Sequence, residues 1–131
     1  DMAVRYSTAM ASSRLAFTHR LDVRFRDCDP MGHVNHAVYL TYLEQCRFRF
    51  WRHLTGTPPG QRAGIIIARA EMDYRSPALP GETLEVGLNV AEIGRSSFTL
   101  TYEIDEVASG RRIADVARSS TDGPDPHEAY A

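Results

Sequence analysis

Hydrophobic and polar side chains alternate along residues 15–25, and this period of two predicts a strand with one buried face. The alternation recurs in residues 65–74, 83–90 and 97–104, and more weakly in residues 112–120. The predicted apolar faces are formed by Leu15, Phe17, His19, Leu21, Val23 and Phe25; by Ile66, Ala68, Ala70, Met72 and Tyr74; by Leu84, Val86, Leu88 and Val90; and by Phe98, Leu100, Tyr102 and Ile104. We therefore expect five strands.

Between the first two strands the period changes to 3.6, which predicts a helix over residues 36–54. Its apolar stripe consists of Tyr39, Leu43, Cys46, Phe50 and Leu54, flanked by Tyr42 and Trp51. Polar side chains occupy the opposite side, and the segment TGTPPGQ, with two adjacent prolines, ends the helix. So many aromatic side chains indicate a helix buried against a broad surface.

The predicted order of elements is β-α-β-β-β-β, with short connections after the helix. This order favours an α+β domain, in which an antiparallel sheet carries the single long helix on one face. A doubly wound parallel sheet would need helices between successive strands. We expect the domain over residues 14–121, a loose leader over 1–13 and a poorly ordered tail over 122–131. One helix leaves sheet edges uncovered, so we expect a homo-oligomer, at least a dimer and in some assemblies a tetramer.

Composition narrows the range of partners. The chain has 131 residues and a net charge of -2, so no basic field suggests nucleic acid. No apolar run approaches the roughly 20 residues of a membrane span. Two cysteines do not make a disulfide framework, and we expect a reducing, cytoplasmic environment.

Polar residues crowd the start of the predicted helix, in the segment DCDPMGHVNHAVY over residues 27–39. Residues 29–32 fit a type I turn, with Asp first, Pro second and Gly fourth. Asn35 suits a helix N-cap, where its side chain would accept a hydrogen bond from a first-turn N–H. A turn and a cap therefore explain part of this segment without any chemistry.

That account does not explain why Asp27, His33 and His36 lie in the same short segment. A helix start carries unpaired N–H groups and about half a positive charge, so it can polarise an acyl carbonyl. A carboxylate beside it could attack the carbonyl carbon or take a proton from an attacking water. The structural and the catalytic interpretation are compatible.

The segment VRFRDCDPMGHVNHAVYLTYLE resembles the signature of the hotdog-fold acyl-CoA thioesterases, specifically the 4-hydroxybenzoyl-CoA thioesterase-like group. YRSPALPGE and GRSSF are similar to recurring segments of that group, so the resemblance spans roughly residues 15–120. It implies a hotdog fold, with an antiparallel sheet wrapped around a central helix. It also implies hydrolysis of an acyl-CoA or acyl-carrier-protein thioester. A non-hydrolytic acyl-CoA sensor and a hydratase or dehydratase are the alternatives on this scaffold.

The resemblance assigns roles to four residues of the helix entrance. The family's catalytic aspartate falls on Asp29, as nucleophile or general base, and its polarising backbone N–H falls on His36. His33 would orient Asp29 or a water, or would simply be a packed loop histidine. Asn35 would be mainly a cap that also approaches the substrate. We expect a structural role for Asp27.

The resemblance also implies where the substrate lies. The acyl group would run along the helix near Tyr39 and Tyr42, with Ile66 and Ala68 of a partner copy lining the cleft. The GRSSF segment would contact the coenzyme A phosphates through Arg95, Ser96 and Ser97. The alternative for that segment is a hairpin turn with an exposed arginine.

Two rival chemistries are disfavoured by the residues themselves. Cys28 lies between two aspartates, which should raise its pKa and disfavour a thiolate nucleophile. The two aspartates and two histidines do not follow a standard zinc spacing, so we predict no metal site. No cofactor is expected, because coenzyme A would be part of the substrate.

Overall fold

The computed structural model describes residues 17–56, 58, 67, 69–93 and 98–120. Its elements are β1 (Phe17–Asp22), the short 3-10 helix η1 (Phe25–Asp27), α2 (His36–Thr55), β2 (Arg69–Tyr74), β3 (Thr83–Ile93), β4 (Phe98–Glu106) and β5 (Arg112–Ser120). The expected order of one strand, one long helix and four further strands is confirmed.

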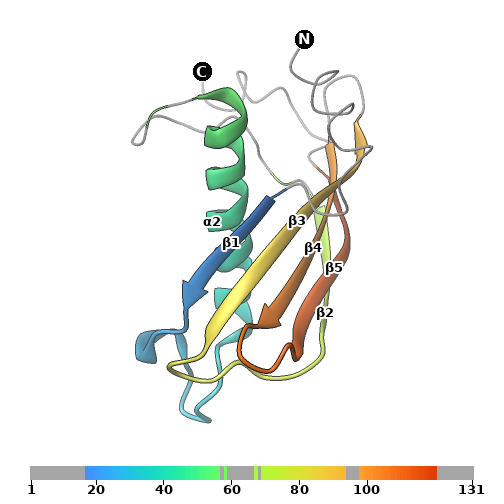
Figure 1. Ribbon diagram of the computed structural model, residues 1–131. Coiled ribbons are helices and arrows are strands. Elements are labelled where there is room, and N and C mark those ends of the chain that lie inside the picture. The colour runs from blue at the N-terminus through green and yellow to red at the C-terminus, as the bar shows by residue number, and fades with distance from the viewer. Residues whose placement is uncertain (1–16, 57, 59–66, 68, 94–97, 121–131) are drawn as a thin grey trace.

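The strands form one antiparallel sheet of five strands in the order β1-β3-β4-β5-β2 (Figure 1). The last three strands along the chain are neighbours, as short connections require. β2 crosses to the far side and pairs with β5, so it lies at one edge of the sheet while β1 lies at the other. The long helix lies against one face of this curved sheet, which is the hotdog arrangement.

Helix α2 has clear signals at both ends. The side chain of Asn35 accepts a hydrogen bond from the Ala37 N–H at 3.0 Å, so the predicted N-cap is confirmed. The helix ends at Thr55 and is capped by Gly56, which has a left-handed φ of 71° and donates its N–H to the carbonyl of Arg52. The helix therefore ends before the two prolines.

The core lies between α2 and the inner face of the sheet. The predicted stripe faces this core, with Tyr39, Leu43, Cys46 and Phe50 buried and Leu54 half-buried. The alternating residues of β3 and β4 meet them, and the following are buried: Leu84, Val86, Leu88, Val90, Leu100, Tyr102 and Ile104. The predicted faces of these two strands are thus confirmed where the side chains are described.

The prediction that Phe25 belongs to the buried face of the first strand is wrong, because this side chain is 86% exposed. β1 ends at Asp22, and Val23 remains buried because it exchanges backbone hydrogen bonds with the segment before β3. The chain then turns into η1, whose Asp27 carboxylate accepts the Arg24 N–H. This turn breaks the alternation and directs the Phe25 ring into solvent.

Strand β2 departs from its predicted apolar face. Ala70 and Tyr74 are exposed and Met72 is only half-buried. β2 has a neighbour on one side only, because it is the last strand of the sheet. An exposed edge is suited to pairing with another chain. The expected homo-oligomer is compatible with this edge and stays a prediction.

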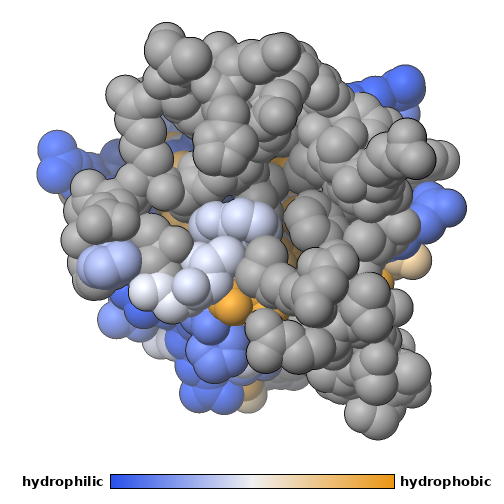
Figure 2. Space-filling view, turned by 90° about the horizontal axis from the view of Figure 1, so that it is seen from above, coloured by the Kyte–Doolittle hydropathy of each residue, from blue (hydrophilic) through white to orange (hydrophobic). Residues whose placement is uncertain are grey.

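Described residues are visible at the rim of the end of the molecule opposite the helix entrance (Figure 2). Figure 2 views that end from above, and the described residues at its rim are mainly hydrophilic. No helix in the described ranges has both the length and the apolar character needed to cross a membrane.

Candidate active site

The loop between η1 and α2 is closed by backbone hydrogen bonds at both ends. Cys28 and Val34 form an isolated antiparallel bridge, and the Asn35 N–H donates to the Asp27 carbonyl at 3.0 Å. The Val34 N–H also donates to the Ala78 carbonyl at 3.0 Å, which ties the loop to the connection between β2 and β3. The loop therefore holds a defined shape at the lower end of the helix in Figure 1.

Asp29 organises the turn inside this loop. Its carbonyl accepts the Gly32 N–H at 2.9 Å, which confirms the predicted four-residue turn, and Gly32 takes a φ of 83°. Its carboxylate oxygen Oδ1 accepts the Met31 N–H at 2.9 Å and the His33 N–H at 3.5 Å. The second carboxylate oxygen, Oδ2, accepts no hydrogen bond from any residue that the structure describes. Asp29 is half-buried, and the bonds to Oδ1 fix its carboxylate. Oδ2 therefore has a fixed position and is free to accept a hydrogen bond.

The first residue of α2 is His36, and its backbone N–H donates no hydrogen bond to the described part of the chain. The next N–H, of Ala37, is taken by the Asn35 side chain, and that of Val38 by the Asn35 carbonyl. Of the first three N–H groups of the helix, the one on His36 is therefore without a partner among the described residues. Asn35 is occupied as a cap, and a further contact with substrate stays a prediction.

The imidazole of His36 is held by Tyr74, a residue for which the sequence predicted only a place on a strand. The two rings stack with centroids 4.0 Å apart and planes 9° apart. The Tyr74 hydroxyl also donates to the His36 carbonyl at 3.4 Å. β2 therefore supports the start of α2, although 38 residues separate the two side chains along the chain. No local pattern in the sequence signals this contact.

Asp27 is deeply buried, with 3% of its surface exposed, and its carboxylate is fully engaged. It accepts the Tyr42 hydroxyl at 2.7 Å, the Arg24 N–H at 3.0 Å and the Arg24 guanidinium at 2.9 Å. Burial would raise the pKa of Asp27, but the hydrogen bonds from Arg24 and Tyr42 outweigh it and hold the pKa below its ordinary value. Burial and the same bond to Asp27 raise the pKa of Tyr42. Asp27 is thus an ionised structural group.

Tyr39 and Tyr42, predicted to line the acyl group, are each only 2% exposed. The hydroxyl of Tyr39 accepts the Ala78 N–H at 3.0 Å, and that of Tyr42 bonds to Asp27. Both rings pack at the start of the core, in an edge-to-face pair with centroids 6.1 Å apart. In the single chain they support the entrance loop, and their contact with a substrate stays a prediction.

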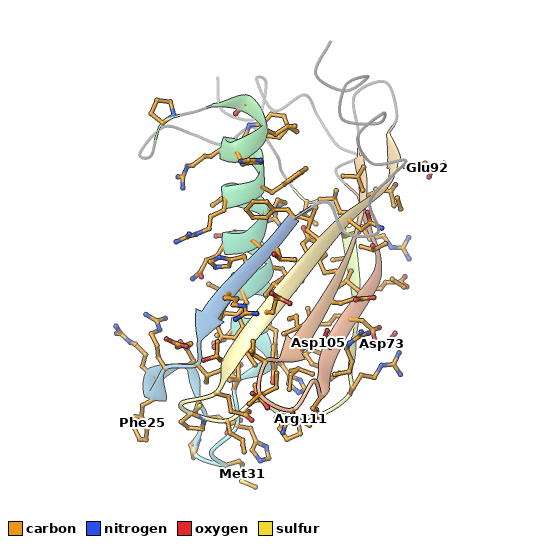
Figure 3. The ribbon with its side chains drawn as sticks, viewed as in Figure 1. Phe25, Met31, Asp73, Glu92, Asp105 and Arg111 are labelled. Carbon is orange, nitrogen blue, oxygen red and sulfur yellow. The ribbon has the colours of Figure 1, made fainter. Side chains whose placement is uncertain are left out.

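Other side chains of the loop point into solvent. The imidazole of His33 is exposed, and this residue contacts Asp29 through its backbone, which donates to Oδ1 and accepts the Asp29 N–H. Met31 is 79% exposed and projects from the lower end of the molecule (Figure 3). The backbone of His33, and not its ring, orients Asp29 in this structure.

The thiol of Cys28 is a poor nucleophile. Its pKa is raised by burial first, and then by the charges of Asp27 and Asp29, which confirms the direction expected from the sequence. Among the described residues, no group of three or more His, Cys, Asp or Glu side chains is arranged to hold a metal ion. Five predicted substrate contacts lie outside the described residues: Ile66, Ala68, Arg95, Ser96 and Ser97.

Comparisons with known proteins show the family to which the chain belongs. The family model of the Thioesterase-like superfamily matches residues 23–121. The chain is 31% identical over 85 residues to the acyl-CoA thioesterase YbgC of Helicobacter pylori, and this segment covers 65% of the chain and 64% of that protein. It is 28% identical over 87 residues to YsmA of Bacillus subtilis, covering 66% of the chain and 59% of YsmA. The chain thus spans about three-fifths of the length of these curated relatives.

A solved structure provides the same comparison in three dimensions. A thioesterase from Thermus thermophilus, crystallised with coenzyme A and zinc, superposes with a TM-score of 0.70 at 34% identity. The match covers 82% of this chain and 83% of that one. Because the family model covers the loop, the helix and all the following strands, the chain belongs to the thioesterase-like superfamily.

Proposed function

We propose that this chain hydrolyses the thioester bond of an acyl-CoA, releasing a carboxylic acid and free coenzyme A. The observation that carries the proposal is the single loop that joins two unsatisfied groups, the Oδ2 oxygen of Asp29 and the backbone N–H of His36. The similarity to the acyl-CoA thioesterase YbgC and to the Thermus thioesterase supports the same reaction. The coenzyme A in the Thermus crystal supports a CoA thioester over other acyl carriers.

In the proposed mechanism, the substrate carbonyl oxygen accepts the N–H of His36 at the positive end of α2. Asp29 then acts as a general base and takes a proton from a water, whose oxygen attacks the carbonyl carbon. The negative charge that develops on the carbonyl oxygen is stabilised by the same N–H and by the helix dipole. Collapse of the intermediate breaks the carbon–sulfur bond, and the leaving thiolate takes the proton from Asp29, which gives the carboxylic acid and free coenzyme A and restores the base.

The open oxygen of Asp29 is suited to this role because its other oxygen is fixed. Two backbone N–H groups, from Met31 and His33, hold Oδ1 and leave Oδ2 as the free acceptor. Direct attack by Oδ2 on the carbonyl carbon would break the carbon–sulfur bond, release the coenzyme A thiolate and leave an acyl-aspartyl anhydride, which water then hydrolyses to the acid and free Asp29. Both routes use the same two groups and give the same products.

The test is release of free thiol from a panel of CoA thioesters by the wild-type chain and by Asp29→Asn. This substitution removes the base and keeps the shape of the side chain, so we expect kcat to fall about 10²–10⁴-fold. Glu44→Gln is the matched control, because Glu44 is an exposed carboxylate on the outer side of α2. Full activity in a folded Asp29→Asn variant would refute the assignment.

Thioester binding without thiol release by the wild type would favour a sensor, and a changed double bond without thiol release would favour a hydratase.

We also propose that two copies associate through the edge of the sheet that β2 forms. The support is the exposure of Ala70 and Tyr74 on this unpaired edge strand. Sedimentation equilibrium measures the mass directly, and a monomer at micromolar concentration would contradict this part of the proposal.

A further inference from the structure

Asp27 is connected to the helix by two separate contacts. Its backbone carbonyl accepts the N–H of Asn35, the residue that caps α2. Its carboxylate accepts the hydroxyl of Tyr42, which lies in the second turn of the helix, at 2.7 Å. Asp27 thus binds both the N-cap residue of α2 and a side chain on the buried side of this helix. It lies two positions before Asp29 in the chain.

The same carboxylate is anchored on its other side by Arg24. The guanidinium Nη2 and Nε and the backbone N–H of Arg24 all donate to it. Asp27 therefore fixes the end of η1 against α2 before the chain enters the loop that carries Asp29. Because the carboxylate is 3% exposed and already accepts these bonds, it is not available to a substrate or a water.

From this geometry we propose that Asp27 and Tyr42 form a positioning pair, which sets where the Asp29 carboxylate lies relative to the His36 N–H. The inference rests on the proposed hydrolysis. It adds Asp27 and Tyr42 as residues that affect the reaction only by positioning Asp29 and His36. Their contact joins the two ends of the loop that carry the reacting groups. A misplacement of about 1 Å between reacting groups can cost a rate factor of about 10², so a small shift of this contact has a measurable effect.

The decisive variant is Tyr42→Phe, which removes one oxygen and keeps the ring in the core. We expect kcat to fall roughly 10–100-fold while KM stays within about twofold, because the shift separates the base from the polarising donor. Asp27→Asn keeps the size of the side chain but removes its charge, and we expect kcat to change in the same direction.

The matched control is Tyr102→Phe. Tyr102 is also 2% exposed, but it lies on β4, where its hydroxyl accepts a hydrogen bond from Arg47 at 3.4 Å. We expect this variant to lose stability without a loss of kcat in the folded protein. Activities are compared at a temperature where circular dichroism shows each variant fully folded.

A merely structural role predicts a different pattern. If Tyr42→Phe kept the wild-type kcat, or if Tyr102→Phe lost as much kcat, the positioning pair would be refuted. A rise in KM with kcat unchanged would also overturn it, because Tyr42 would then contact the substrate directly.

Amide hydrogen exchange makes the test independent of turnover. The positioning pair predicts faster exchange of the loop amides of Gly32, Val34 and Asn35 in Tyr42→Phe and unchanged exchange of these amides in Tyr102→Phe. Equal exchange in the two variants would refute the inference. A wild-type chain that hydrolyses no thioester would instead refute the proposed function, and the exchange result would still decide whether the pair holds the loop.

Discussion

Acidification from about pH 7.5 to about pH 5 should destabilise the folded chain through one buried histidine, His19 on β1. Its side chain is 9% exposed, and its Nε2 atom forms no hydrogen bond with any described residue. Burial is the main cause that lowers the pKa of His19 below its ordinary value of 6.5, and the positive charge of Arg49 lowers it further. A hydrogen bond with Gln45 acts in the opposite direction but does not restore the ordinary value.

The sign follows from the order in which the two states take up the proton. As the pH falls below 6.5, the unfolded chain binds a proton at position 19 before the folded chain does. The free energy of unfolding therefore decreases in this range, with a slope that approaches about 1.4 kcal/mol per pH unit for one proton. The decrease ends below the folded pKa. Asp27 acts in a separate window, because its lowered pKa removes stability only as the pH falls below its ordinary value of 3.8.

Urea unfolding at steps of half a pH unit measures this slope, with circular dichroism as the signal. His19→Gln removes the titrating group, so we expect a smaller slope between about pH 6.5 and pH 5 than in the wild type. His53→Gln is the control, because His53 is an exposed residue in the last turn of α2. The reasoning would be refuted if His19→Gln kept the full wild-type slope, or if His53→Gln removed it.

Two further substitutions test the core and the helix entrance. Leu88→Ala removes a side chain that is 0% exposed on β3, so we expect a loss of about 2–5 kcal/mol in urea unfolding, and a loss below about 1 kcal/mol would contradict the burial. Asn35→Ala removes the cap at Ala37, so we expect a loss of about 0.5–2 kcal/mol in thermal unfolding, whereas Glu44→Ala on the exposed side of α2 should have little effect.

The sequence predicted those elements whose partners lie on a regular face. The alternation from Leu84 to Val90 was sufficient to predict β3 and its buried face, because β3 lies in the interior of the sheet with α2 over one face. The helix was predictable because its stripe and its Asn35 cap are both local patterns. A buried polar residue on α2, Arg47, gave no such signal, and it is 9% exposed beside Tyr102.

The errors and omissions occur where a local pattern depends on distant contacts. Phe25 continued the alternation of the first strand, but the strand ends early in the η1 turn, whose Asp27 carboxylate is held by Tyr42, 15 residues further along the chain. Tyr74 supports His36 because β2 lies at the sheet edge beside β5, and a sequence of strands does not specify that crossing. The turn at Asp29 was predicted, whereas the Asp27 bond to Tyr42 was not.

The entrance loop shows why a catalytic interpretation and a structural one fit the same residues. Three polar side chains there form hydrogen bonds within the chain: Asn35 caps the helix, Asp27 binds Tyr42, and Oδ1 of Asp29 holds the turn. Groups that remain outside these contacts must bind water or a ligand, because the first N–H groups of a helix have no partner within the helix. Within the described residues, Oδ2 of Asp29 and the N–H of His36 are left without protein partners, one an acceptor and the other a donor. A thioester carbonyl and a water between them would supply the complementary groups, so the local folding rules account for the loop and its two unsatisfied atoms account for the proposed reaction.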